Sequence, residues 1–341
     1  RARRVAILRG LRVGVRVLYG QGRVQMAIGA ARAMRGVADA AIGRSYLESV
    51  RHPGIVSALG AALSNGHPDP IEFQAARPSR IVVARATPVA ATPATGAVLV
   101  LHDVTELRKS DQVRRDFVAN VSHELRTPLT AIRGYVEALS EESLDAEERE
   151  RFMAVIMKQA GRMERLVRDL LRLASLDARE EPIENEPCSI CDLLESVVRD
   201  LSPSIERKRQ IVTVDVAPEG ATFVTDIAKL QDALRNVLEN ASNYSPEGSR
   251  IQVSATRAND RVVLRVEDEG PGIPESDLER IFERFYRVDK ARSRESGGTG
   301  LGLSIVKHLV QRLGGTVRAA NRPTGGAVLT ITLPGPAIAR S

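Results

Sequence analysis

The chain of 341 residues is short of cysteine, of aromatic residues and of long apolar segments, and each shortage narrows what it can be. Its two cysteines, Cys188 and Cys191, fit a reducing cytoplasm. No further Cys or His lies near them in sequence, so neither a zinc site nor a thioredoxin-like redox pair is supported, and we expect small buried residues at a domain edge. Tryptophan is absent and aromatic residues make up 3% of the chain, so its cores must be aliphatic.

Long apolar runs are missing from the sequence, and acidic residues are scarce in its first fifty positions. No run of about eighteen uncharged apolar residues occurs, so the sequence predicts no membrane-spanning helix. Because the chain begins with Arg1 rather than Met, we expect an upstream segment that links it to a membrane. The first fifty residues hold ten arginines against Asp39 and Glu48. This bias suits a position near nucleic acid or an anionic membrane surface, and it equally fits a composition in which arginine outnumbers lysine throughout.

The first 104 residues alternate between apolar and polar positions in short segments separated by Gly, Pro and Asn, which is typical of strands joined by turns. The predicted strands are residues 13–18, 24–28, 71–75, 80–87 and 97–102, and a short helix is predicted near residues 30–34. A strand pair, small helices and three more strands resemble a PAS sensor domain. The resemblance implies either a sensor or a ligand-free dimerisation domain.

A helical pattern begins at about Glu106. Apolar residues recur every three or four positions from Phe117 to Leu139, and again in a second predicted helix over residues 146–178. The two helices form an antiparallel hairpin whose apolar stripe is too wide for one pair to cover. Pairing two hairpins into a four-helix bundle buries this stripe, so we predict a homodimer.

His123 is the candidate reactive residue of the first helix. The carboxylate of Glu124 is adjacent, and the hydroxyl of Thr127, four residues on, can face the same solvent-side point. The remaining four histidines lack this combination of a neighbouring carboxylate and an amphipathic helix: His52, His67, His102 and His308.

Residues beyond an acidic, proline-containing linker alternate between helical and strand patterns, which predicts helices over an antiparallel sheet. The predicted helices are residues 193–201 and 227–241, and the predicted strands are residues 251–255, 262–267 and 328–333. Asn236 and Asn240 lie one turn apart on the second of these helices, where two amide oxygens can meet a hard cation and its phosphates.

Two glycine-containing motifs follow in the same region. Asp268 comes directly after a predicted strand, where a carboxylate can accept the exocyclic amine of adenine, and Gly270 and Gly272 let the backbone approach the ring. The glycines of residues 297–302 open a predicted helix, and exposed amides at a helix start bind phosphate. No Walker Lys-Ser/Thr pattern is present, which argues against a P-loop. Each motif alone also fits a solvated helix face or an ordinary turn.

Taken together, the motifs resemble those of one family. The run Ser122-His-Glu-Leu-Arg-Thr-Pro-Leu129 closely resembles the H-box of sensor histidine kinases. The asparagine, Asp268 and glycine motifs, with residues 281–287 between the last two, resemble the N, G1, F and G2 boxes of GHKL ATPases over residues 188–334. The implied fold is a multidomain α+β chain, and its order most resembles the phosphate-sensing PhoR type. Its parts are a PAS-like domain (1–104), a dimerisation and phosphotransfer hairpin (105–180), a linker (181–187) and a GHKL, or Bergerat, α/β-sandwich ATPase domain (188–336).

The resemblance also implies ATP and Mg²⁺ and assigns residues to them. Asn240 would ligate magnesium with support from Asn236, Asp268 would read adenine, Tyr244 would pack on the base and Arg287 would reach the terminal phosphates. Residues 283–298 would form a mobile lid. Further implied nucleotide contacts are Asn243, Gly270, Gly272, Ile273, Lys290, Gly298, Thr299, Gly300, Leu301, Gly302 and Leu303. Many relatives have Lys where this chain has Asn243, so phosphate neutralisation would rest more on Arg287 and on lid cations such as Lys290 or Arg292.

The implied reaction is attack of neutral His123 on the γ-phosphorus of ATP, with Glu124 accepting or orienting the other ring proton. The phosphoryl group would pass to an aspartate of a response regulator, expected to be a DNA-binding, PhoB-like protein. Thr127 would position water for a phosphatase activity, and the kinase would act at the cytoplasmic face of a bacterial plasma membrane without binding nucleic acid itself. Two alternatives are a GHKL protein without histidine transfer, either degenerate or a serine kinase, and a basic scaffold for nucleic acid, for which no recognisable motif occurs.

Overall fold

The structure, a computed structural model, describes residues 13–19, 22–29, 43–50, 52–76, 79–90, 96–141, 144–178, 181–217, 222–289 and 298–335. The chain divides into two compact units, Arg1–Asp116 and Phe117–Ser341. Each unit has its own apolar core. Among the described helices, none combines the length and the apolar character that crossing a membrane requires.

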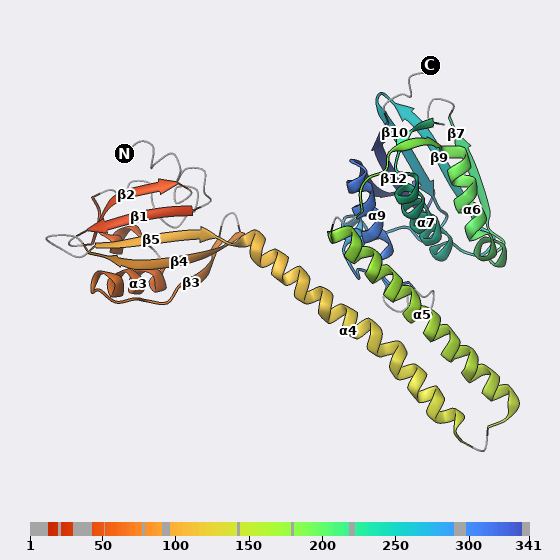
Figure 1. The fold of residues 1–341 in the computed structure, drawn as a ribbon, viewed down its shortest axis with the longest axis horizontal. Coiled ribbons are helices and arrows are strands. Elements are labelled where there is room, and N and C mark those ends of the chain that lie inside the picture. The colour runs from red at the N-terminus through yellow and green to blue at the C-terminus, as the bar shows by residue number, and fades with distance from the viewer. Residues whose placement is uncertain are drawn as a thin grey trace. The chain divides into compact units, whose positions relative to one another are not determined.

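The first unit is a five-stranded antiparallel sheet with helices α2 (Tyr46–Ser49) and α3 (Pro53–Leu63) (Figure 1). The strands lie in the order β2-β1-β5-β4-β3. Their bounds are β1 (Val13–Tyr19), β2 (Arg23–Gly29), β3 (Ile71–Ala76), β4 (Ser79–Val89) and β5 (Gly96–Asp103). All five predicted strands are confirmed, whereas the helix predicted near residues 30–34 lies outside the described residues.

Alternation along the strands explains how this sheet is covered. Ala97, Leu99 and Leu101 of β5 are buried, and Val82 of the paired strand β4 is buried on the same face against Leu59 of α3. Because side chains alternate across a strand, the intervening residues of β5 point to the other face. The sequence pattern that predicted strands therefore also determines which face meets the helices.

Two long helices form the hairpin, α4 (Thr105–Leu139) and α5 (Ala146–Ala178) (Figure 1). The bounds of α5 are those predicted. Asp145 Oδ1 accepts a hydrogen bond from the backbone N–H of Glu148 at 2.8 Å, and Glu148 Oε2 accepts one from the N–H of Asp145 at 3.2 Å. This reciprocal capping box satisfies amide groups that the first turn leaves unpaired, and it explains why α5 begins where it does.

The rest of the second unit is a five-stranded sheet in the order β11-β12-β10-β9-β7, with three helices packed against it (Figure 1). The helices are α6 (Ile190–Arg207), α7 (Ile227–Tyr244) and α9 (Gly302–Arg312). The strands are β7 (Ile211–Val216), β9 (Arg250–Ala258), β10 (Arg261–Glu267), β11 (Thr316–Asn321) and β12 (Ala327–Pro334). A separate ribbon pairs β6 (Glu186–Ser189) with β8 (Thr222–Thr225).

The prediction of a wholly antiparallel sheet was wrong at one edge. Strand β7 pairs in parallel with β9, whereas the other neighbours in this sheet are antiparallel. The chain between β7 and β9 passes through β8 and α7, and a crossover connection of this kind is what parallel pairing requires. Strands β6, β7, β8 and β11 were not predicted, whereas α6, α7, β9, β10 and β12 were.

The apolar core of the second unit also includes part of the hairpin. Leu166, Leu173 and Leu176 of α5 are buried in the same cluster as Leu230 of α7 and Leu309 of α9. The second half of α5 is thus packed into the same core as helices α7 and α9, which cover the sheet. This packing places α5 beside the cavity described next.

Candidate nucleotide and phospho-acceptor site

A cavity of about 1100 Å³ opens between α7, the loop after β10, the glycine loop before α9 and the second half of α5. Most of the sequence-predicted nucleotide residues line it: Asn236, Asn240, Asn243, Tyr244, Asp268, Gly272, Ile273, Arg287, Gly298, Thr299, Gly300, Gly302 and Leu303. Gly270 and Leu301 are not among the lining residues. Lys290, like Arg292, lies outside the described residues.

Asp268 is held at the end of β10 by backbone groups. Its Oδ1 accepts hydrogen bonds from the N–H of Gly270 at 2.8 Å and from the N–H of Ala327 at 3.1 Å. A Cβ on Gly270 would lie 2.9 Å from that same oxygen, so glycine is needed there although it does not line the cavity. Burial raises the pKa of Asp268, and the two backbone hydrogen bonds and Arg322 partly oppose the rise. The result is a buried carboxyl group with a fixed orientation.

The predicted asparagine pair faces the start of α9. Asn236 Nδ2 donates to the backbone carbonyl of Asp232 at 2.8 Å, which fixes the orientation of its amide. A Cβ at Gly302 would lie 3.0 Å from Asn236 Oδ1 and 3.7 Å from Asn240 Nδ2, so glycine lets α9 approach α7 closely. Leu301, the N-cap residue of α9, has no side-chain capping bond. The first amides of α9 are therefore available to an anion beside the amide oxygen of Asn236 and the amide nitrogen of Asn240.

The first residues of the predicted lid contact the glycine loop. Phe285, with φ of +64°, donates its N–H to the carbonyl of Gly300 at 2.8 Å, and a Cβ at Gly300 would lie 3.0 Å from the Phe285 backbone. Arg287 donates to the carbonyl of Gly298. These contacts bring the predicted phosphate-binding arginine to the predicted phosphate-binding loop.

The hairpin presents His123 and Thr127 to solvent, as the helix pattern predicted. Thr127 Oγ1 donates to the backbone carbonyl of His123 at 3.2 Å. Glu124 lies instead on the side facing the nucleotide cavity: its Oε2 is 2.8 Å from Arg162 Nη2 and 3.1 Å from Arg287 Nη2. The carboxylate beside the candidate acceptor thus contacts an arginine that lines the candidate donor site.

Residues of α5 line the cavity too, and the sequence motifs did not reveal them: Arg165, Arg168, Asp169 and Arg172. Asp169 Oδ2 accepts a hydrogen bond from Thr299 Oγ1 of the glycine loop at 2.7 Å. Burial raises the pKa of Asp169, and this hydrogen bond partly opposes the rise. In the sequence these four residues look like any charged helix face. Only their positions in the structure identify them as residues of the cavity.

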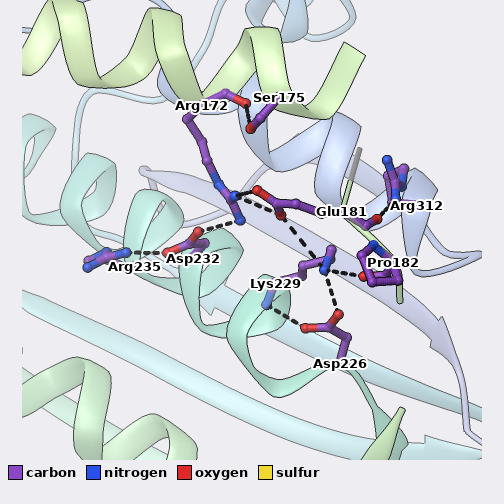
Figure 2. A network of polar contacts seen from close by, with 9 residues as sticks. All are labelled: Arg172, Ser175, Glu181, Pro182, Asp226, Lys229, Asp232, Arg235 and Arg312. Carbon is purple, nitrogen blue, oxygen red and sulfur yellow. Dashed lines mark hydrogen bonds and ion pairs between the residues drawn. The ribbon is translucent and has the colours of Figure 1, made fainter. Parts of the chain in front are cut away.

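A network of charged groups connects α5, the linker and α7 (Figure 2). Arg172 pairs with Glu181 at 2.6 Å and with Asp232 at 2.9 Å.

Lys229, which is buried, pairs with Asp226 at 2.7 Å and donates to the carbonyl of Pro182 at 2.9 Å. Burial raises the pKa of Asp226, but hydrogen bonds from Lys229 and Glu184 outweigh this effect and lower it overall. The start of the predicted linker is therefore anchored by the ion pairs of Glu181 and by backbone hydrogen bonds of Pro182 and Glu184.

Two family comparisons agree with this geometry. Residues 225–337 match the family described as histidine kinase-, DNA gyrase B- and HSP90-like ATPases, and residues 113–179 match the His kinase A (phospho-acceptor) domain. The fold and site thus define an ATPase domain joined to a phospho-acceptor hairpin. This chain has both parts in this order, and it belongs to the sensor histidine kinases of two-component systems.

Curated relatives support the same family. The chain is 40% identical over 243 residues to the sensor histidine kinase WalK of Bacillus subtilis, covering 70% of this chain and 39% of that protein. It is 38% identical over 234 residues to the phosphate regulon sensor protein PhoR of Pseudomonas aeruginosa, covering 68% of this chain and 53% of that protein. The chain therefore spans about half or less of the length of these relatives.

Solved structures share the fold. The histidine kinase ThkA, crystallised with the response regulator TrrA, superposes with a TM-score of 0.55 at 22% identity, over 94% of this chain and 95% of that one. The histidine kinase AdeS of Acinetobacter baumannii superposes with a TM-score of 0.52 at 23% identity, over 62% of this chain and 98% of that one. At these identities the likeness concerns the fold alone.

Proposed function

We propose that the chain is an ATP-dependent histidine kinase that phosphorylates itself on His123. The observation that carries the proposal is the ion pair between Glu124, the neighbour of His123, and Arg287, which lines the nucleotide cavity. An acceptor and a donor site that share a contact need only a local rearrangement to react. Phosphoryl transfer depends mainly on such positioning and on charge neutralisation.

The cavity suits ATP through distinct contacts. Asp268 would accept the adenine amine, Tyr244 would pack on the base, and the glycine loop with the start of α9 would bind phosphates. The donor set suits Mg²⁺ that arrives with the nucleotide, because the described residues contain no cluster of three His, Cys, Asp or Glu side chains that could hold a metal alone. Asn240, supported by Asn236, would hold the ion, which would supply charge neutralisation at the phosphates.

The chemical step follows from the residues on the hairpin. A lone pair on a neutral His123 ring nitrogen would attack the γ-phosphorus, a nitrogen–phosphorus bond would form and the bond to the leaving ADP oxygen would break. Glu124 would orient the imidazole or accept the proton from its other ring nitrogen. Arg287 would neutralise the terminal phosphates, with Lys290 as a further lid cation.

The partner would be a response regulator that takes the phosphoryl group on an aspartate at the exposed hairpin face. By analogy with the phosphate regulon sensor among its relatives, we propose a DNA-binding, PhoB-like regulator. Thr127, exposed one turn after His123, would position water for dephosphorylation of that regulator. This role predicts that Thr127→Ala slows the phosphatase reaction without preventing autophosphorylation.

Dimerisation and location complete the proposal. Apolar side chains on α4 and α5 stay exposed in a single chain, and a second hairpin would cover them in a four-helix bundle. The first unit, with its sheet order β2-β1-β5-β4-β3 and its covering helices, fits the proposed PAS-like role as sensor or dimerisation domain. We further propose that an upstream segment holds the kinase at the cytoplasmic face of the membrane.

Labelled ATP tests the reaction. The chain is incubated with γ-labelled ATP and magnesium, and the protein-bound label is expected to survive base and to be lost in acid, as for a phosphoramidate. His123→Gln should abolish this label, whereas His102→Gln, which alters an exposed histidine of strand β5, should not. An acid-stable ester, or no label in the unaltered chain, would favour a serine kinase or a nucleotide-binding protein without histidine transfer.

A further inference from the structure

One carboxylate oxygen of the hairpin is shared by two arginines. Glu124 Oε2 lies 2.8 Å from Arg162 Nη2 and 3.1 Å from Arg287 Nη2. All three side chains are largely shielded from water, with exposed fractions of 23% for Glu124, 10% for Arg162 and 5% for Arg287. Shielded charges interact more strongly than exposed ones, so the loss of any one partner affects the other two.

The two arginines differ in where they are anchored. Arg162 lies on α5, so its contact with Glu124 joins the two helices of the hairpin. Arg287 lies after β10 beside the glycine loop and lines the nucleotide cavity. When the ATPase domain changes position relative to His123, the first contact can persist, whereas the second must break.

The two arginines also differ in their alternative partners. A nucleotide in the cavity offers Arg287 phosphate oxygens, which carry more negative charge than one carboxylate and bind guanidinium groups well. Arg162 is the only charged residue of α5 that is buried in the described structure, and its guanidinium donates to Glu124 at 2.8 Å. Glu124 is thus the carboxylate that balances its charge, and this contact lies within the hairpin.

We propose that Arg162 is a positioning residue for Glu124, and that Glu124 and the phosphates of ATP compete for Arg287. Without nucleotide, Glu124 binds both arginines, and neither Glu124 nor Arg287 is free for the reaction. Nucleotide binding draws Arg287 to the phosphates, and Arg162 keeps the Glu124 carboxylate beside His123. The part that concerns phosphorylation rests on the proposed function, whereas the competition for Arg287 concerns nucleotide binding alone.

Removing Arg162 should make nucleotide binding harder. In Arg162→Met the carboxylate of Glu124 keeps Arg287 as its cation, and phosphate can recruit Arg287 only by leaving a shielded carboxylate unpaired. We expect the Kd of a non-hydrolysable ATP analogue to rise about tenfold, in the range of coupling between close charge pairs. Arg162→Lys, which keeps the charge, should recover much of that affinity. Glu124→Gln removes the competitor and should tighten binding of the analogue.

The decisive measurement combines the substitutions. Because Arg162 is inferred to act through Glu124, Arg162→Met should not weaken analogue binding when Glu124→Gln is already present. Titration of the whole chain by calorimetry measures the four affinities, and Arg151→Met, at an exposed arginine paired along its own helix with Glu147, serves as the matched control. An unchanged affinity in Arg162→Met, or an equal loss in both backgrounds, would overturn the inference.

Steady-state phosphorylation separates this inference from the proposed function. Arg162→Met should raise the KM for ATP and also lower kcat, because Glu124 is no longer held; a purely structural role would lower the amount of active protein without changing the KM. If the chain does not label His123 at all, the proposed function fails while the analogue affinities still test the competition. If His123 is labelled but the affinities do not change as expected, only the competition fails.

Discussion

At the scale of single residues, the nucleotide site depends on how a few polar groups are oriented. Asp268 shows this best, because two backbone amides bind its Oδ1 and hold the carboxyl group in one orientation. The carbonyl of the same residue accepts a hydrogen bond from Arg322 Nη1 at 3.0 Å. Side chain and backbone are thus fixed together, which suits a group that must present an acceptor to a base.

Asp268→Asn should weaken nucleotide binding by about 10- to 100-fold, the cost of losing a charge-assisted hydrogen bond and leaving a buried group unsatisfied. The asparagine would turn its carbonyl oxygen toward the amides of Gly270 and Ala327. Its NH₂ would then face the adenine amine, so that one donor meets another. Fluorescence titration with an ATP analogue measures the effect, and Glu275→Gln, at an exposed acidic residue nearby, should leave the affinity unchanged. Equal affinities for both variants would argue against adenine recognition by Asp268.

Glu124 illustrates what residue-level reasoning from sequence misses. The sequence places a carboxylate next to His123 and so predicts a proton acceptor, a role that stays a prediction. The ion pairs with Arg162 and Arg287 join residues 38 and 163 positions away from Glu124. No local pattern marks Arg162, because arginines are frequent along α5 and its burial becomes evident only when the helices are packed.

At the scale of elements, the turn between β11 and β12 is tied to the site by glycine. Gly325 and Gly326 both have φ of +94°, in the region that L side chains rarely adopt. A Cβ on Gly326 would lie 1.9 Å from the carbonyl oxygen of Asp268, whereas a Cβ on Gly325 would have no atom within 4 Å. Substituting these glycines one at a time therefore distinguishes two costs. At Gly325 a side chain meets only the unfavourable positive φ, whereas at Gly326 it also clashes with the backbone of Asp268.

Gly325→Ala should lower the free energy of unfolding by about 1–2 kcal/mol, the usual cost of a non-glycine residue at positive φ. Gly326→Ala should cost at least about 2 kcal/mol more, because the turn must also move away from Asp268, and it should weaken nucleotide binding as well. Urea unfolding and analogue titration of both variants measure these effects. Similar losses of stability in the two variants would mean that the close approach to Asp268 is not required.

The elements differ in how well local sequence predicts them. Helix α5 has a capping box and a regular apolar stripe, and its predicted bounds are confirmed. Strand β7 was missed although Val212, Val214 and Val216 alternate with Thr213 and Asp215; it is an edge strand, and most of its residues are exposed. Its parallel pairing with β9 depends on a crossover through α7. Short strands such as β6 and β8 likewise exist only because they pair with each other.

At the scale of the whole molecule, the hairpin has apolar side chains that its own chain leaves uncovered. On α5 these are Met153, Met157, Val167 and Leu171, spaced as one helical stripe, and Met157 and Leu171 are each 68% exposed. On α4, Leu129 and Val136 are about half exposed. Such stripes are characteristic of surfaces that meet a partner, as expected for the proposed four-helix bundle.

Met157→Glu should convert the proposed dimer to monomer, because it places a charge in the middle of that apolar surface. Sedimentation measurements over a range of concentrations would show a weakened self-association. Lys158→Glu, at the adjacent exposed position away from the stripe, should leave the dimer intact. A chain that sediments as a monomer without substitution, or a Met157→Glu dimer of unchanged affinity, would contradict this surface.

The amino-acid sequence alone predicted the order of the hairpin and the ATPase domain, the long helices, most of the strands and many of the residues that line the nucleotide cavity. These features depend on local patterns, namely apolar periodicity, capping residues and glycines at turns. Such patterns can be recognised in a sequence without knowledge of the fold. The packing of the folded chain was needed to show that α5 contributes Asp169 and Arg172 to the cavity, that Glu181 anchors the start of the linker through ion pairs and that Glu124 is shared by two arginines. Contacts of this kind join charged residues far apart in sequence, and charged residues follow no period that predicts their partners.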